Sequence, residues 1–219
     1  TGYDNHWNDC RGRADYQANV QNIDDTAFLK SSENQIVTGI NSTIRRRFAT
    51  GFSNGGHFCF KLALESPEWI DGIAAISANL PVADGRDCAE ATEFVPTMIV
   101  NGTEDWINPY DGGLVSIRGN DTRGTVHSTM ETMKYFMELG NCDSDPSSVI
   151  YDDVNIEDES TIKSYTWHCD GGSVAGRLYQ VNNGGHTLPH FENQLAPVLG
   201  NTNRDVIIAR EIWNFFNRL

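Results

Sequence analysis

The stretch RRRFATGFSNGGH, residues 45–57, contains the spacing that decides the fold. It places Gly51, Ser53 and Gly55 between an apolar segment and a helix-like run. This order predicts a short strand over 45–50, a sharp turn at the serine, and a helix that ends at the next proline. Glycine suits the positions two residues before and after the serine, because strand and helix come close together there.

The same turn indicates chemistry at Ser53. A residue at the tip of a strand-to-helix turn has strained backbone angles, and its side chain is presented to solvent. The helix that follows directs free N–H groups and the positive end of its dipole toward the hydroxyl. These groups favour the oxyanion that forms during acyl transfer, and Asn54 supplies the first of them. We interpret Ser53 as a nucleophile; the alternative is an ordinary glycine-rich turn.

Strand-like and helix-like segments alternate along the rest of the chain. Continuous apolar runs of strand length are typical of buried parallel strands. The patterns predict helices over 24–39, 125–140 and 205–216, strands over 72–77, 95–102 and 177–181, and an antiparallel hairpin of 148–151 with 161–168. Because no linker interrupts this alternation, we expect a single α/β domain over 1–219, with a mostly parallel sheet flanked by helices.

Apolar stripes on three helices predict which side of each packs inward. The expected inward residues of the first helix are Ile23, Ala27, Phe28 and Ile36. Those of the helix over 125–140 are Met130, Met133, Phe136 and Met137, and those of the last helix are Ile208, Ile212, Phe215 and Phe216. We interpret the methionines as core filler rather than as a functional stripe.

Two further polar residues follow predicted strands. Asp105 comes shortly after the strand over 95–102, and His186 shortly after the strand over 177–181. Functional residues gather at the carboxyl ends of parallel strands, so we expect Ser53, Asp105 and His186 to meet. In such a triad the histidine removes the serine proton and returns it to the leaving group, while the aspartate orients and stabilises the imidazole.

Other residues compete for the same roles. Glu104 and Asp111 are the other carboxylates near the same strand end, and His190 is the nearest other histidine. His57 lies one helical turn after the serine, too near in the chain to face it as a base. Gly184 and Gly185 favour His186, because we expect them to permit a tight approach to the serine.

The composition excludes several kinds of partner. A net charge of −14 repels phosphate backbones and anionic lipid, so we expect neither nucleic acid nor a membrane as a partner. No apolar run approaches the length of a membrane span. The acidic residues between 152 and 159 are interpreted as a solvated loop rather than as a metal site.

The chain has five cysteines. None forms a C-x-x-C pair, so neither a zinc site nor a thioredoxin-type site is supported. Cys59 lies in an apolar helix, and we expect it to be a buried free thiol. The other four lie in loop-like sequence and suffice for two disulfides, which implies an oxidising compartment. The spacing alone does not fix which cysteines pair; we expect Cys142 to pair with Cys169 and Cys10 with Cys88.

Together these motifs resemble the secreted esterase family of LpqC-like α/β-hydrolases, which is related to polyhydroxybutyrate depolymerases and feruloyl esterases. The similar pieces occur in the same order along nearly the whole chain. They are Trp7 to Cys10, Asp24 to Leu29, Ala49 to Gly56, Gly102 to Asp105, Pro109 to Gly113, Gly184 to Pro189 and Glu211 to Phe216.

The resemblance implies an α/β-hydrolase fold with Ser53, Asp105 and His186 as the catalytic triad. It implies hydrolysis of carboxylic esters through an acyl-enzyme intermediate. The implied substrates are small-molecule or oligomeric esters: short-chain, aryl or feruloyl, or hydroxyalkanoate oligomers. Neither a cofactor nor a metal is implied, and the protein is expected to be secreted or periplasmic.

One departure from the family concerns its N-terminal part. Relatives carry more sequence ahead of the loop that contains Trp7 and Cys10, including the first sheet strands and a His-Gly loop that donates an oxyanion N–H. We therefore expect a sheet that lacks the first N-terminal strands, with Asn54 as the one identifiable oxyanion donor. The chain is then a fragment, a hydrolase completed by a partner segment, or a reduced hydrolase.

Two other functions stay open at this point. A non-catalytic relative that acts as a binding module for a carbohydrate or a protein would explain the lack of an oxyanion segment. The presence of serine, aspartate and histidine favours an enzyme instead. A peptidase of the same fold would use the same triad.

Overall fold

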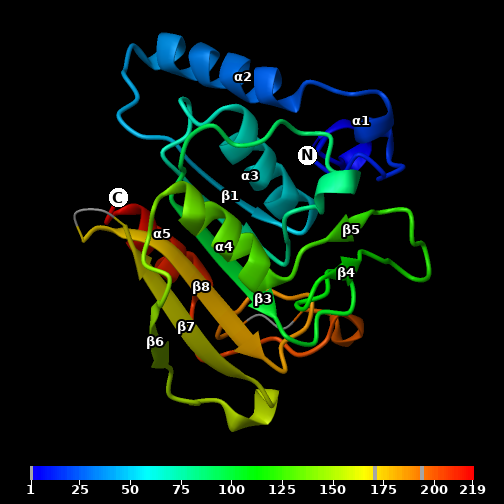
Figure 1. The fold of residues 1–219 in the computed structure, drawn as a ribbon, viewed down its shortest axis with the longest axis vertical. Coiled ribbons are helices and arrows are strands. Elements are labelled where there is room, and N and C mark those ends of the chain that lie inside the picture. Colours follow the sequence, from blue (N-terminus) through cyan, green and yellow to red (C-terminus); the bar gives the residue numbers. More distant parts are fainter. Residues whose placement is uncertain (1, 170–171, 193–194) are drawn as a thin grey trace.

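A six-stranded sheet forms the centre of the protein (Figure 1). The computed structural model describes residues 2–169, 172–192 and 195–219. In sheet order the strands are β1 (Phe48–Phe52), β2 (Gly72–Ile76), β3 (Thr97–Gly102), β8 (Val174–Asn182), β7 (Thr161–His168) and β6 (Ser147–Ile150). The first four run parallel, and β7 pairs antiparallel with both β8 and β6. The predicted α/β class, mostly parallel sheet and antiparallel hairpin are confirmed.

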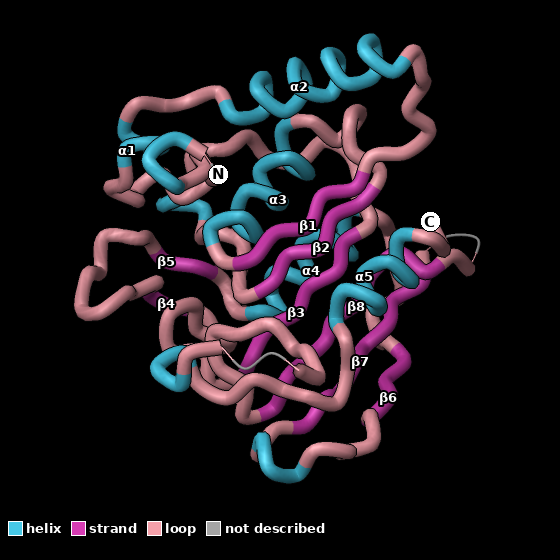
Figure 2. Tube along the Cα trace, turned by 180° about the vertical axis from the view of Figure 1, so that it is seen from behind, coloured by secondary structure: helices cyan, strands magenta, loops and turns pink. Residues whose placement is uncertain are grey.

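Helices cover both faces of the sheet (Figures 1 and 2). α3 (Asn54–Glu65) and α4 (Thr129–Leu139) pack on one face, and α5 (Ile208–Phe216) packs on the other. Successive residues of β2 serve the two faces in turn: Ile73 contributes to the core under α3 and α4, and Ala74 to the core under α5. This alternation between two cores explains why the buried strands are continuous apolar runs.

The remaining elements are short or lie at the periphery. α1 (Gln17–Val20) and α2 (Asp25–Ile40) precede the sheet in the chain, and β4 (Gly113–Leu114) pairs with β5 (Thr125–Val126) in a small hairpin. Short 3-10 helices occur at Tyr3–Asn5, Ala83–Gly85, Ile156–Asp158 and Pro197–Leu199. No helix within the described ranges is long and apolar enough to cross a membrane.

β1 carries the serine turn and occupies one edge of the sheet. The predicted strand over 45–50 is displaced, because the pairing with β2 runs from Phe48 opposite Gly72 to Phe52 opposite Ile76. The strand therefore continues directly into the turn. Among the described residues β1 pairs with one neighbour, β2.

α2 begins where the sequence predicts, but the prediction of its buried face is wrong. The side chain of Asp24 accepts a hydrogen bond from the N–H of Ala27 at 2.8 Å and caps the helix. Phe28 is 57% exposed and Ile36 is 63% exposed, and Ala27 is exposed as well, whereas Ile23 is half-buried.

Polar contacts explain this difference. α2 lies apart from the sheet, above α3 in Figure 1. Its buried Asp25 accepts a hydrogen bond from the N–H of Asn8 at 2.7 Å, and its Glu33 pairs with Arg47 at 2.8 Å. These contacts hold Asp25 and Glu33 toward the protein, and Phe28, Ile36 and Ile40 lie on the exposed side of the helix.

α4 and α5 are shorter than the segments predicted as helices. The Ser128 side chain and Glu131 form a capping box that starts α4, which leaves residues 125–126 for β5. α5 starts at Ile208 because the carboxylate of Asp205 accepts backbone hydrogen bonds from the loop after β6. Met130 is 41% exposed, which corrects the expected inward stripe of α4, while its other members and the four predicted in α5 are buried.

Both predicted disulfides are present. Cys10–Cys88 joins the N-terminal loop to the loop between β2 and β3, and Cys142–Cys169 joins the end of α4 to the end of β7. Cys59 is a buried free thiol, and burial raises its pKa to about 12. Such bridges are typical of proteins from oxidising compartments.

Candidate active site

Ser53 occupies the sharp turn between β1 and α3. Its φ of 55° and ψ of −119° are strained for a residue with a side chain. The N–H of Ser53 donates to the carbonyl of Ile76 at 2.8 Å, which fixes the turn against the end of β2. A Cβ at Gly51 would lie 2.2 Å from the carbonyl carbon of Gly55, so the chain passes itself at a distance that only glycine at position 51 permits.

The second glycine of the pattern, Gly55, does not lie at the close approach of strand and helix that the sequence predicts. A Cβ at Gly55 would meet nothing within 4 Å. The close approach on the helix side falls at Gly56, where a Cβ would lie 2.8 Å from the side chain of Ala78. The steric requirement therefore applies to positions 51 and 56, because the helix rotates position 55 away from the strand.

Asp105 lies in the turn after β3 with both carboxylate oxygens engaged. Oδ1 accepts hydrogen bonds from the N–H groups of Ile107 at 2.9 Å and Asn108 at 2.8 Å. Oδ2 lies 2.8 Å from Nδ1 of His186. Asp105 is 3% exposed and His186 is 5% exposed, so this pair is shielded from water. The expected contact between Asp105 and His186 is present, and it leaves Nε2 as the ring nitrogen available to accept a proton.

Backbone contacts join the loops that carry these two residues. The N–H of Glu104 donates to the carbonyl of Gly184 at 2.9 Å, and the N–H of His186 donates to the carbonyl of Leu199 at 2.7 Å. A Cβ at Gly102 would lie 2.2 Å from the carbonyl oxygen of Gly184, and one at Gly185 would lie 2.1 Å from that of Leu199. We expected Gly184 and Gly185 to permit a close approach to the serine, but their near neighbours are other residues. A Cβ at Gly184 would lie 2.5 Å from the side chain of Val181, and Gly102 and Gly185 permit the close packing of the two loops and of the chain at 199–200.

The His186 ring lies beside the serine turn. Its centroid is 4.9 Å from that of Phe52, the residue that precedes Ser53. Within the described part of the chain, no hydrogen bond joins the Ser53 hydroxyl to the His186 ring. Such hydrogen bonds are often long in unliganded enzymes and shorten when substrate binds.

The competing residues lie in other surroundings. Glu104 and Asp111 are exposed, and His190 Nδ1 accepts a hydrogen bond from the N–H of Glu192 at 3.1 Å. His57 is buried within α3. Burial and the charge of Arg11 lower the pKa of His57 to about 3, so this ring is neutral at physiological pH.

A cluster that the sequence does not predict surrounds the first residue of α3. Asn54 donates from Nδ2 to the carboxylate of Asp9 at 2.8 Å and to the hydroxyl of Tyr16 at 3.1 Å. Asp9 in turn pairs with Arg11 at 2.6 Å. The one signal in the sequence is an aspartate and an arginine on either side of Cys10, and that spacing carries no information about a contact with residue 54.

The described residues show no arrangement for a metal. Nowhere in the described ranges do three or more His, Cys, Asp or Glu side chains group so that they could hold an ion.

No protein-family model matches the chain. A search of curated proteins found similarity to one described as "Putative esterase NocK", from Nocardia uniformis subsp. tsuyamanensis. The two sequences are 29% identical over 169 residues, which cover 74% of this chain and 48% of the relative. The chain therefore spans about half the length of the curated relative that it matches.

Proposed function

We propose that this protein is a serine hydrolase of the α/β-hydrolase type that cleaves carboxylic esters. The observation that carries the proposal is the buried contact between Asp105 and His186, 2.8 Å long, beside the strained turn that holds Ser53. A serine, a histidine and an aspartate in these roles form the usual triad of acyl-transfer enzymes. Similarity to a relative described as an esterase supports the choice of esters as substrates.

In the proposed reaction Ser53 Oγ attacks the ester carbonyl carbon while His186 Nε2 takes the hydroxyl proton. Asp105 stabilises the imidazolium that forms. The N–H of Asn54 donates to the oxygen that becomes negative. The tetrahedral intermediate expels the alcohol, which receives the proton from His186, and leaves an acyl group on Ser53. Water then attacks the acyl carbon while His186 takes its proton. The bond between the acyl carbon and Ser53 Oγ breaks, His186 returns the proton to Ser53 Oγ, and the acid leaves.

The finer features of this proposal follow the resemblance to LpqC-like esterases. The substrates are short-chain, aryl or feruloyl, or hydroxyalkanoate oligomer esters, and no cofactor takes part. The two disulfides support an exported protein, secreted or periplasmic, because such bridges persist in oxidising compartments.

A fluorophosphonate probe together with the Ser53→Ala variant tests the reaction. The probe labels only an activated serine, so we expect it to label the native protein and not the variant. Hydrolysis of p-nitrophenyl butyrate is expected to fall by at least about 10³-fold in Ser53→Ala. Asp105→Asn is expected to lose activity too, because the imidazole then loses its orienting carboxylate.

Several outcomes would contradict the proposal. Wild-type turnover in a Ser53→Ala protein that circular dichroism shows to be folded would remove the serine from the mechanism. An unlabelled native protein would favour a binding module instead. Faster hydrolysis of a matched p-nitroanilide than of the ester would favour a peptidase.

A further inference from the structure

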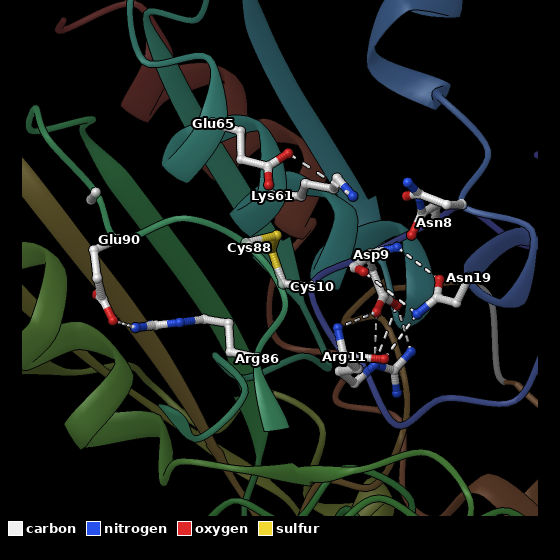
Figure 3. Close-up of a disulfide and its surroundings, with 12 residues drawn as sticks. Asn8, Asp9, Cys10, Arg11, Asn19, Lys61, Glu65, Arg86, Cys88 and Glu90 are labelled. Atoms are coloured by element: carbon white, nitrogen blue, oxygen red, sulfur yellow. Dashed lines mark hydrogen bonds and ion pairs between the residues drawn. A yellow bond between two sulfur atoms is a disulfide. The ribbon is translucent and has the colours of Figure 1, made fainter. Parts of the chain in front are cut away.

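A buried polar cluster lies at the start of α3, beside the candidate nucleophile. It consists of Asp9, Arg11 and Tyr16, none of which is more than 6% exposed. The Asp9 carboxylate accepts hydrogen bonds from Arg11 Nη2 at 2.6 Å and from the Tyr16 hydroxyl. Figure 3 shows Asp9 and Arg11 together on one side of the disulfide that joins Cys10, the residue between them in the sequence, to Cys88.

Asn54 connects this cluster to the serine turn. Its Oδ1 accepts a hydrogen bond from the N–H of Trp7 at 2.7 Å, and its Nδ2 donates to the carbonyl of Trp7 at 3.0 Å. The same Nδ2 lies 2.8 Å from the Asp9 carboxylate and 3.1 Å from the Tyr16 hydroxyl. The Trp7 ring also stacks on Phe58, one turn further along α3, with 5.2 Å between centroids. Both polar atoms of the Asn54 side chain, Oδ1 and Nδ2, therefore bind residues outside the helix, and these bonds hold the first turn of α3 in place.

The charges in this cluster are costly to bury. Burial alone raises the pKa of Asp9, but the charge and hydrogen bonds of Arg11 outweigh it and hold that pKa well below its ordinary value. Asp9 and Arg11 therefore form a buried ion pair, with side-chain exposures of 0% and 5%. Buried ion pairs of this kind often add no more stability than apolar residues of the same volume. Asp9 and Tyr16 contact Asn54 directly, and Arg11 is joined to it through these two residues.

We propose that Asp9, Arg11 and Tyr16 are positioning residues for the oxyanion donor and that they act through Asn54. This inference rests on the proposed serine hydrolase function. The N–H of Asn54 belongs to the first turn of α3 and has no acceptor within the helix, so it is free to bind a substrate oxygen. The cluster keeps that N–H in a fixed position while negative charge develops on the substrate oxygen. Loss of one oxyanion donor costs about 10²–10³ in rate, and a misplacement of about 1 Å costs about 10².

Two substitutions test the proposal. Tyr16→Phe removes one hydroxyl from the cluster and retains the ring and the Asp9–Arg11 pair. Asn54→Ala keeps the backbone N–H and removes every side-chain contact that holds it. We expect kcat for p-nitrophenyl butyrate to fall about 10-fold in Tyr16→Phe and further in Asn54→Ala, with KM within about twofold of the wild type.

A transition-state analogue separates positioning from mere folding. Phenylboronic acid forms a tetrahedral adduct with an activated serine and places one oxygen where the oxyanion forms. Its dissociation constant is expected to rise by the factor by which kcat falls. Titration of reactive serines with a fluorophosphonate gives kcat per active site in each variant, so that unfolded protein does not contribute.

Tyr151→Phe is the matched control. It also removes a phenol hydroxyl from a hydrogen bond, 3.0 Å long, to Tyr179 on the α5 face of the sheet, and kcat is expected to stay unchanged. Unchanged kcat and boronate affinity in both Tyr16→Phe and Asn54→Ala would overturn the proposal, as would a rise in KM alone. Failure of the probe to label wild-type Ser53 would overturn the proposed function and this inference together.

Discussion

Two glycines near the serine differ sharply in what surrounds them. A Cβ at Gly51 would lie 2.2 Å from backbone atoms of Gly55, whereas a Cβ at Gly55 would meet nothing within 4 Å. Gly51→Ala must push β1 and α3 apart, so we expect it to lower the free energy of unfolding by about 2 kcal/mol or more and to abolish ester hydrolysis.

Gly55→Ala is the matched control for this substitution. Alanine is favoured over glycine in a helix by about 0.5–1 kcal/mol, so we expect stability to be unchanged or slightly raised. Urea unfolding of the two variants measures the contrast. Equal destabilisation by Gly51→Ala and Gly55→Ala would mean that residue 51 does not lie as close to the backbone of Gly55 as described.

The buried ring of His57 predicts that the stability of the protein depends on pH. Its pKa is about 3 in the folded protein, because burial and the nearby Arg11 charge disfavour the imidazolium, while Asp9 opposes them and His186 adds to them. The ring has a pKa of about 6.5 in the unfolded chain. The unfolded chain therefore binds a proton below that pH while the folded protein does not. The stability that His57 contributes is complete above about pH 6.5 and is lost as the pH falls toward 3.

We expect His57→Gln to remove this dependence. Between pH 6.5 and 5 the wild type should lose up to about 1.4 kcal/mol per pH unit more than the variant does. Urea unfolding of both proteins at several pH values measures the difference. Parallel curves would show that His57 is protonated in the folded state or accessible to water.

Among the elements, α4 begins with a capping box formed by Ser128 and Glu131. The Ser128 side chain accepts a hydrogen bond from the N–H of Glu131 at 3.1 Å, and Glu131 Oε2 accepts one from the N–H of Ser128 at 2.9 Å. α4 supplies Met133 and Phe136 to the core beneath it. We expect Ser128→Ala to lower the midpoint of thermal unfolding, at a cost of about 1 kcal/mol.

Ser31→Ala, on the exposed side of α2, is the control for this loss. It removes the same hydroxyl at a site that caps nothing, and its effect is expected to stay within about 0.5 kcal/mol. A similar change in both variants would indicate that the cap contributes no more than a surface serine.

The elements also show what could be predicted from sequence. Local patterns suffice for β2, β3 and α3, because continuous apolar runs and the glycine–serine turn act over a few residues. The predicted inward side of α2 is wrong, because Asp25 and Glu33 make polar contacts with distant parts of the chain and these contacts orient the helix. The cluster around Asn54 is missed for the same reason, since residues 9, 11 and 16 meet it only in space. The contact of Asp105 with His186 follows from parallel strands that end at one edge.

At the scale of the whole molecule, the two disulfides differ in span. Cys10–Cys88 encloses a sequence separation of 78 residues and Cys142–Cys169 one of 27. The loop-entropy relation assigns about 4–5 kcal/mol to the first and about 3–4 kcal/mol to the second. We expect the Cys10→Ala, Cys88→Ala double variant to lose more stability than Cys142→Ala, Cys169→Ala.

Hydrogen exchange locates the two effects. Removal of the first bridge is expected to speed exchange at the start of α3, because the loop with Asp9 is then released. Removal of the second is expected to speed exchange in β6 and β7. The reverse ranking of stability, or exchange that rises evenly through the protein, would contradict this expectation.

The bridge between Cys10 and Cys88 also has a topological consequence. It closes a covalent ring that contains Ser53, while Asp105 and His186 lie outside both rings that the disulfides make. The segment 41–46, between α2 and β1, is largely exposed and lies within the Cys10–Cys88 ring. A protease that cuts there yields two pieces that remain linked, one with the loop of Asp9 and the other with all three candidate catalytic residues. The two pieces stay covalently joined while the surroundings are oxidising, and a reductant then removes the covalent link between the loop of Asp9 and the three candidate catalytic residues.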